Sequence, residues 1–288
     1  MTQDPQNVRT QVSFSDDIAQ ISLSHVLEIM KALQSYKEGL SIVGGWAPYF
    51  LLRQYQHDDN DFEHVGSIDI DIAVNPEVIN ETQYAQLEEL LRGRGYEPHP
   101  KIEYSYYKNV KTSDGREVEI RIDFLAPEYG GTGRAHRNQR VQNDFLARKA
   151  KGADLAFEHR FEFTLNDRLP NGADASVSFY VADIVAMIAM KSYVLGHRYK
   201  EKDAYDIFSL VLHYKDGVES VAAEVKPFIA DIPLPEGIDN LKEQFATQSS
   251  QGPASVADFH RDEGESREQR TQQAYLQIQR LLELLENG

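Results

Sequence analysis

Residues 41–72 carry the pattern that decides the fold: Ser41-Ile-Val-Gly-Gly-Trp-Ala-Pro-Tyr-Phe50, then a polar loop, then Val65-Gly-Ser-Ile-Asp-Ile-Asp-Ile72. The first part predicts a short buried strand, a glycine turn and a helix whose N-terminus faces the glycines. In the second part Asp69 and Asp71 alternate with isoleucines, as in a strand with one buried face. Side chains two residues apart on a strand share a face, so we expect the two carboxylates side by side. Such a pair needs a shared proton or a cation, and we expect a cation.

The composition limits the classes of function. The chain has 288 residues, 41% hydrophobic and 26% charged, which is typical of a globular protein and long enough for two domains. A net charge of -16 predicts that the molecule as a whole repels nucleic acid, so a polyanion would need a local basic patch or metal ions. The absence of cysteine excludes disulfides, thiolate zinc sites and cysteine nucleophiles.

Two further patterns concern location. The N-terminal sequence lacks the basic and apolar regions of a signal peptide. The most apolar run, residues 181–195, is interrupted by Asp183 and Lys191 and is too short to span a bilayer. We therefore expect a cytoplasmic protein without a membrane partner.

Hydrophobic periodicity predicts an α/β (α+β) fold, with strands and helices followed by a mainly helical C-terminal domain. We expect strands near residues 40–43, 68–72, 102–110, 116–125, 159–165 and 176–181, and helices near 24–36, 183–195, 202–214 and the C-terminus. The predicted domain boundaries are a flexible N-terminus at 1–14, a sheet domain at 15–181 and a helical domain at 182–288, with a polar linker near 249–265.

Asp123 is a third aspartate that, like the first two, alternates with apolar residues on a predicted strand. It shares a strand face with Glu119 and Arg121, while Ile120 and Ile122 occupy the other face. Three acids on neighbouring strands offer the hard oxygen ligands that Mg²⁺ prefers, and Mn²⁺ is the alternative ion. With two ions, one can activate an attacking hydroxyl and the other can stabilise a leaving pyrophosphate.

Two glycine turns add to this hypothesis. Gly44 and Gly45 precede a predicted helix, where backbone can approach a triphosphate, and Gly66-Ser67 forms a second small loop just before the acids. Each piece alone has a structural alternative: glycines commonly only turn the chain, and Asp123 could be an exposed strand residue. Aspartate is depleted from strands, however, and the pieces taken together in this order favour a site.

The order Gly44-Gly45-x-Ala47, Gly66-Ser67-x-Asp69-x-Asp71 and Asp123 resembles the nucleotidyltransferase fold of the DNA polymerase beta superfamily. Lys191, followed by Lys200-Glu-Lys-Asp203-Ala-Tyr-Asp206, is similar to the Lys-x-x-Asp-x-x-Asp motif of the AbiEii-like branch, which contains toxins of toxin-antitoxin and phage-defence systems. The resemblance spans residues 40–214 and implies a small mixed sheet flanked by helices. One departure is that His64-Val65-Gly66 replaces the basic residue that relatives often carry before the Ser-x-Asp pair.

The resemblance implies metal-dependent transfer of a nucleoside monophosphate from a nucleoside triphosphate, such as ATP or GTP, to a hydroxyl, with release of pyrophosphate. Asp69, Asp71 and Asp123 would be catalytic and bind metal, and Asp123 would assist deprotonation of the acceptor. Lys191 and Asp206 would also be catalytic, with Asp206 positioning Lys191 or the substrate. The nucleotide would be bound by Gly44, Gly45, Gly66, Ser67, Lys191 and Lys200. The acceptor would be a tRNA or a protein, and a cognate antitoxin would be a partner. The alternatives are a small-molecule nucleotidyltransferase of the antibiotic-modifying type and a non-catalytic nucleotide-binding module.

Other charged features have simpler alternatives. Lys191 lies on an otherwise apolar helix face, where a lysine needs either an anion or a route to solvent by snorkelling. Asp203 and Asp206 could be dipole partners in a first helical turn. The basic segment 134–151 could bind RNA or a triphosphate, or could be a solvated loop.

Overall fold

The computed structural model describes residues 10–11, 16–79, 81–127, 138–140, 146–198 and 200–286. The chain divides into two compact units, each of which is discontinuous in sequence. The sheet unit comprises Asp16–Phe50 and Gly66–Ala186, and the helical unit comprises Met1–Ser15, Leu51–Val65 and Met187–Gly288. The division falls within two helices, α2 (Trp46–Tyr55) and α5 (Ile184–Leu195).

The sheet unit is built on one mixed sheet with the strand order β3-β4-β5-β2-β1-β9-β8, to which β7 adds beside β5 and β6 beside β7. Its strands are β1 (Leu40–Ile42), β2 (Ile70–Val74), β3 (Glu97–Pro98), β4 (Ser105–Lys111), β5 (Glu117–Pro127), β6 (Asn138–Arg140), β7 (Leu146–Ala150), β8 (Arg160–Arg168) and β9 (Asp174–Ala182). Its helices are α1 (Asp16–Ala32), the 3₁₀ helix η3 (Gln34–Gly39), the start of α2, α3 (Glu81–Arg92), α4 (Leu155–Glu158) and the start of α5. The predicted α/β class is confirmed.

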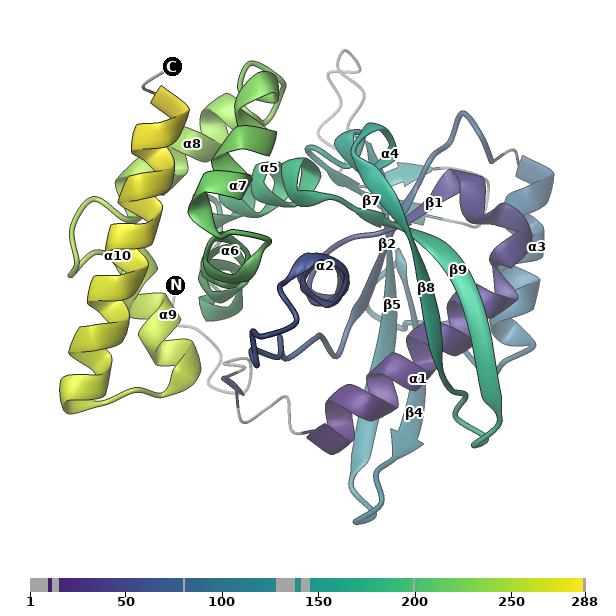
Figure 1. Cartoon of the computed structure of the whole chain (residues 1–288). Helices are drawn as coiled ribbons and strands as arrows, with labels where there is room; N and C mark the ends of the chain where they lie inside the picture. Colours follow the sequence, from purple (N-terminus) through teal and green to yellow (C-terminus); the bar gives the residue numbers. More distant parts are fainter. Residues whose placement is uncertain are drawn as a thin grey trace. The chain divides into compact units, whose positions relative to one another are not determined.

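The core of the sheet unit follows from the strand alternation. Ile70 and Ile72 of β2 and Ile122 of β5 are fully buried, and Ile70 pairs with Ile122 across a parallel ladder. Helix α1 packs on β8 and β9 and touches α3, so both helices cover the same sheet face (Figure 1). The opposite face of β2 and β5 carries Asp71 and Asp123, together with Arg121.

The helical unit contains most of the remaining helices (Figure 1). They are the end of α2, most of α5, α6 (Glu201–His213), α7 (Val218–Val225), the 3₁₀ helix η4 (Lys226–Phe228), α8 (Leu234–Gln244), α9 (Gln251–His260) and α10 (Gly264–Glu286). Helix α9 packs on α6 and α10, and α10 also packs on α7 and α6. This unit therefore has its own core between α6, α7, α9 and α10.

The predicted linker at 249–265 is wrong, because helix α9 occupies 251–260. Its polar composition hides a buried stripe that contains Gly252, Ser255, Val256 and Phe259. A Cβ on Gly252 would lie 2.4 Å from the Phe245 ring, so the small residue lets α9 approach its neighbour closely. The small residues of this segment resemble the composition of a linker, but in the structure they allow close packing of α9.

The predicted domain boundaries need one further correction. The sheet unit ends at residue 186, close to the predicted 181, but residues 51–65 belong to the helical unit. The segment 51–65 belongs to the helical unit because it contacts residues that are distant in sequence. Hydrophobic periodicity carries no information about such contacts. The predicted flexible N-terminus at 1–14 lies outside the described residues except for 10–11. Within the described ranges, every helix is too short or too polar to cross a membrane.

Candidate functional site

The three predicted acids meet on one face of the sheet unit. Strands β2 and β5 are parallel neighbours, and Asp71 is directly in register with Asp123. Asp69 lies one residue before β2 rather than within it, which corrects the predicted strand start. Asp123 is buried, with 7% of its surface exposed, whereas Asp69 and Asp71 are partly exposed. The parallel pairing brings together residues that are more than fifty positions apart in sequence.

Arg121 lies among these acids. Its Nη2 is 3.0 Å from Asp69 Oδ2, and its Nε donates to Asp123 Oδ1 at 2.9 Å. Burial alone would lower the pKa of Arg121, but the charges of Asp69 and Asp123 outweigh it and raise the pKa. Sequence reasoning placed Arg121 on the acid face without giving it a role, although its position two residues before Asp123 was a signal.

The predicted glycine turns lie against this cluster and beside α2. Gly44 has a φ of +64°, and a Cβ there would lie 1.9 Å from Asp71 Oδ2, so only glycine admits the carboxylate. The Val43 N–H also donates to the Asp71 carbonyl at 3.0 Å. Gly45 directly precedes α2. The first glycine turn and the Asp71 carboxylate are thus in contact.

The second turn is also closely packed. Gly66 has a φ of +68°, and a Cβ there would lie 2.7 Å from the Trp46 ring at the start of α2. Ser67 is buried beside it. The packing of Gly66 on Trp46 holds the loop before Asp69 against the first turn of α2.

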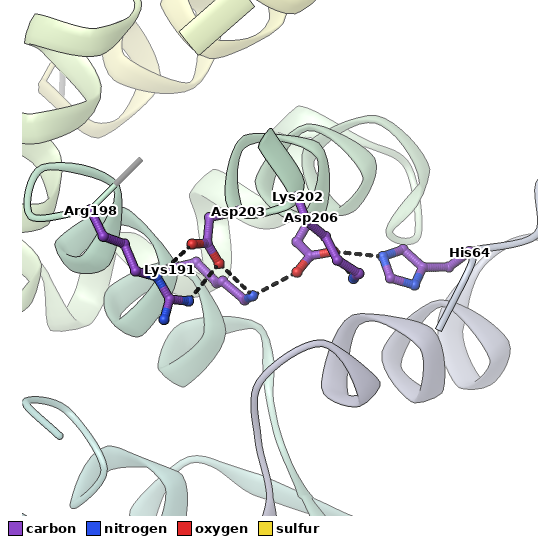
Figure 2. Close-up of polar contacts among 6 residues, drawn as sticks. All are labelled: His64, Lys191, Arg198, Lys202, Asp203 and Asp206. Atoms are coloured by element: carbon purple, nitrogen blue, oxygen red, sulfur yellow. Dashed lines mark hydrogen bonds and ion pairs between the residues drawn. The ribbon is translucent and has the colours of Figure 1, made fainter. Parts of the chain in front are cut away.

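The helical unit contains a second cluster, shown in Figure 2. Lys191 of α5 donates to Asp203 Oδ1 at 2.9 Å and to Asp206 Oδ2 at 2.6 Å, both on α6. Lys191 is only 7% exposed, so the snorkelling alternative is wrong and the expected anion is supplied by these two carboxylates. The predicted contact between Asp206 and Lys191 is therefore present.

Three further residues complete this cluster, and sequence reasoning assigned none of them a role in it. Asp206 Oδ1 accepts hydrogen bonds from Lys202 Nζ at 2.7 Å and His64 Nε2 at 3.0 Å. Arg198 binds Asp203 with its Nε at 2.9 Å and its Nη2 at 3.1 Å. Lys202 lies inside the recognised motif and Arg198 lies two residues before it, which was a usable signal, whereas nothing in the sequence connects His64 with α6. Lys200, a predicted nucleotide ligand, is exposed at the N-cap of α6.

The electrostatics of this cluster follow from burial and pairing. Burial raises the pKa of a carboxyl, but Lys191 and Lys202 outweigh this effect and lower the pKa of Asp206. Lys191 and Arg198 likewise outweigh burial and lower the pKa of Asp203. Burial would lower the pKa of Lys191, yet Asp206 and Asp203 raise it. For Lys202, burial dominates and lowers the pKa. Burial also lowers the pKa of His64 to about 4, so a neutral imidazole donates to Asp206 at pH 7.

The structure thus groups the predicted site residues into two clusters, which belong to different units. The acid cluster (Asp69, Asp71 and Asp123 with Arg121) lies in the sheet unit with Gly44, Gly45, Gly66 and Ser67. The lysine cluster (Lys191, Arg198, Lys202, Asp203, Asp206 and His64) lies in the helical unit with Lys200. Half of the basic segment at 134–151 lies outside the described residues, and the described half contains β6 and β7.

The acid cluster has the donor chemistry of a magnesium site. No group of three or more His, Asp or Glu side chains in the described part of the chain has the arrangement of a metal site. The carboxylates of Asp69 and Asp123 nevertheless already converge on one cation, the guanidinium of Arg121. Hard oxygen ligands of this kind suit Mg²⁺, which Asp69, Asp71 and Asp123 would hold in exchange for the guanidinium.

Comparisons with known proteins add one structural likeness. No family model and no curated protein matches the chain. The chain is similar to the crystal structure of JHP933 from Helicobacter pylori, with 14% identity, 94% of each chain covered and a TM-score of 0.44. A likeness at this level carries no argument, so any function must be argued from the residues themselves.

Proposed function

We propose that the protein is a nucleotidyltransferase of the AbiEii-like type, which moves a nucleoside monophosphate from a nucleoside triphosphate to a hydroxyl acceptor. The observation that carries this proposal is the convergence of Asp69, Asp71 and Asp123 on one face of the sheet unit, with Asp71 against Gly44. Three carboxylates beside a tight glycine turn before a helix suit a triphosphate with its counter-ion.

The reaction is a displacement at the α-phosphorus. The acceptor oxygen bonds to phosphorus, the bond to the bridging oxygen of the β-phosphate breaks, and pyrophosphate leaves. Asp123 takes the proton of the acceptor hydroxyl, and the backbone at Gly44-Gly45 and Gly66-Ser67 binds the triphosphate. A divalent ion bound by the acids supplies charge neutralisation and lowers the pKa of the acceptor hydroxyl. Catalysis then rests on positioning and on charge.

The lysine cluster supports the AbiEii-like assignment. Lys191, Asp203 and Asp206 of the recognised motif form one connected network. On this reading a tRNA or a protein is the acceptor, and a cognate antitoxin is the regulatory partner in the cytoplasm.

The proposal is tested with labelled nucleoside triphosphates, Mg²⁺ or Mn²⁺, and separate acceptor pools of tRNA, protein extract and small alcohols. We expect label in the tRNA or protein pool, and a loss of at least a hundredfold in Asp71→Asn. A matched control is Asp174→Asn, because Asp174 lies on the same sheet but its side chain is 90% exposed. No transfer by the parent, or equal transfer by Asp71→Asn, would overturn the assignment.

The position of Arg121 favours a second candidate, a nucleotide-binding module without catalysis. A guanidinium that pairs with Asp69 and Asp123 already neutralises the acids without a metal. Calorimetry separates the two candidates: triphosphate binding that is independent of Mg²⁺ and without turnover favours the module. Turnover with purified small alcohols alone would instead favour the antibiotic-modifying type.

A further inference from the structure

Ser105 is a buried hydroxyl that makes a direct contact with the third acid. It begins β4 and pairs directly with Asp123 in the antiparallel ladder between β4 and β5, so the two side chains share a face. Ser105 Oγ donates to Asp123 Oδ1 at 2.6 Å, and Ser105 is only 1% exposed. The distance is that of a short, charge-assisted hydrogen bond.

The backbone hydrogen bonds of Ser105 do not involve its hydroxyl group. The Ser105 N–H donates to the Ile102 carbonyl at 3.1 Å, and the Ser105 carbonyl accepts from the His99 N–H at 2.8 Å. The backbone groups are therefore satisfied independently of the side chain. What the hydroxyl adds is its contact with Asp123.

Ser105 and Arg121 bind the same carboxylate oxygen. Arg121 Nε donates to Asp123 Oδ1 at 2.9 Å from the strand that bears Asp123, and Ser105 donates to it from the neighbouring strand. Two donors from different strands fix the torsion of the carboxyl group, and both bind Oδ1 rather than the second oxygen, Oδ2. The chemistry of the third acid depends on which oxygen is presented.

We propose that Ser105 is a positioning residue, which orients the Asp123 carboxylate so that Oδ2 is presented to the acceptor hydroxyl and the ion. This inference rests on the proposed function. Arg121 cannot serve alone, because it also binds Asp69 and would move when an ion replaces it there. Ser105 donates to Asp123 from the neighbouring strand, so it keeps Asp123 in place when the charges rearrange.

The test compares Ser105→Ala with Ser41→Ala. Ser41 is a matched control because it is also a buried serine on this sheet, in β1, and its Oγ has no hydrogen-bond partner among the described residues. We expect Ser105→Ala to lower kcat on the order of tenfold with KM for the triphosphate unchanged, and Ser105→Thr to restore it by keeping the hydroxyl. Ser41→Ala should keep the parent's kcat. Thermal melts establish that each variant is folded.

A second readout does not require turnover. Mn²⁺ titrated into each protein without nucleotide and followed by electron paramagnetic resonance should bind on the order of tenfold more weakly to Ser105→Ala than to the parent or Ser41→Ala. Weaker Mn²⁺ binding by Ser105→Ala in a parent that transfers nothing supports the positioning role and contradicts the reaction. Equal kcat and equal Mn²⁺ binding in a folded Ser105→Ala overturn the role and leave the reaction standing. A parent with neither transfer nor Mn²⁺ binding overturns both.

Discussion

At the scale of single residues, charge balance in the acid cluster is the central feature. Asp69, Asp71 and Asp123 share one face, and Arg121 contacts two of them. Carboxylates at this spacing repel one another unless a cation lies among them. The guanidinium therefore stabilises the sheet unit in the absence of an ion, and it competes with any ion that binds there.

Replacing Arg121 by Gln should reveal this competition. Without divalent ions, Arg121→Gln should lose about 2 kcal/mol of stability, because Asp69 and the buried Asp123 lose their counter-charge. Added Mg²⁺ should then raise the melting temperature more in the variant than in the parent, because ion binding no longer displaces a guanidinium. Differential scanning calorimetry with and without Mg²⁺ measures both effects.

Arg116→Gln is the control, since Arg116 is exposed and pairs with Asp114 in the adjoining hairpin turn. Its stability and its response to Mg²⁺ should match the parent. An equal Mg²⁺ shift in Arg121→Gln and the parent would show that the guanidinium and the ion do not compete.

At the scale of elements, helices α5 and α6 are connected by buried ion pairs between their side chains. Lys191 is a buried cation on α5 whose partners, Asp203 and Asp206, both lie on α6. His64, in the segment before the Gly66 turn, donates a hydrogen bond to the Asp206 carboxylate. In the same segment, the Val65 N–H donates to the Tyr205 hydroxyl at 3.3 Å. The lysine cluster thus fixes two helices and the segment 64–65 at once.

Lys191→Met should destabilise the helical unit strongly. It leaves Asp203 and Asp206 buried with less counter-charge, which costs about 3–5 kcal/mol for a buried pair that loses one partner. Urea denaturation followed by circular dichroism measures the change. Lys242→Met is the control and should change stability by less than about 1 kcal/mol, because Lys242 pairs with Glu286 at the surface of α8.

A compensating variant separates charge from packing. Lys191→Met combined with Asp203→Asn removes one of the two carboxylates and should recover part of the lost stability. If the combined variant is no more stable than Lys191→Met, the loss comes from side-chain packing rather than from an unpaired carboxylate.

At the scale of the whole molecule, the described histidines with a lowered pKa all lie in one unit. His64, His213 and His260 all belong to the helical unit, and burial lowers the pKa of each to about 4. These histidines are neutral in the folded unit and take up protons on unfolding below their ordinary pKa of 6.5. Their contribution to stability is therefore present above about pH 6.5 and is lost as the pH falls towards 4.

Acid should therefore unfold the helical unit first. Between pH 6.5 and pH 5, His64 alone removes about 2 kcal/mol of stability, and the other two histidines act in the same direction. The chain's single tryptophan, Trp46, lies in the sheet unit, so its fluorescence reports that unit, whereas far-ultraviolet circular dichroism reports mainly the helices. In a titration from pH 7 to pH 4.5, the circular dichroism signal should fall before the fluorescence changes.

His64→Gln provides the control for this titration. The amide can keep a donor towards Asp206 but does not titrate, so this variant should lose about 2 kcal/mol less between pH 6.5 and pH 5. Coincident transitions by both probes in the parent would contradict the confinement of the effect to the helical unit.

The sequence by itself determined the α/β class, the glycine turns, the face that Asp69 shares with Asp71 and the face that Asp123 shares with Arg121. It could do so because strand alternation and turn chemistry are local properties, set by residues within a few positions of one another. Only the tertiary structure decided that Arg121 and Ser105 bind Asp123, that His64 reaches Asp206, and that 251–260 is a packed helix. Those contacts depend on strand register and helix packing between distant segments, and no periodicity along the chain encodes which buried partner a side chain will meet.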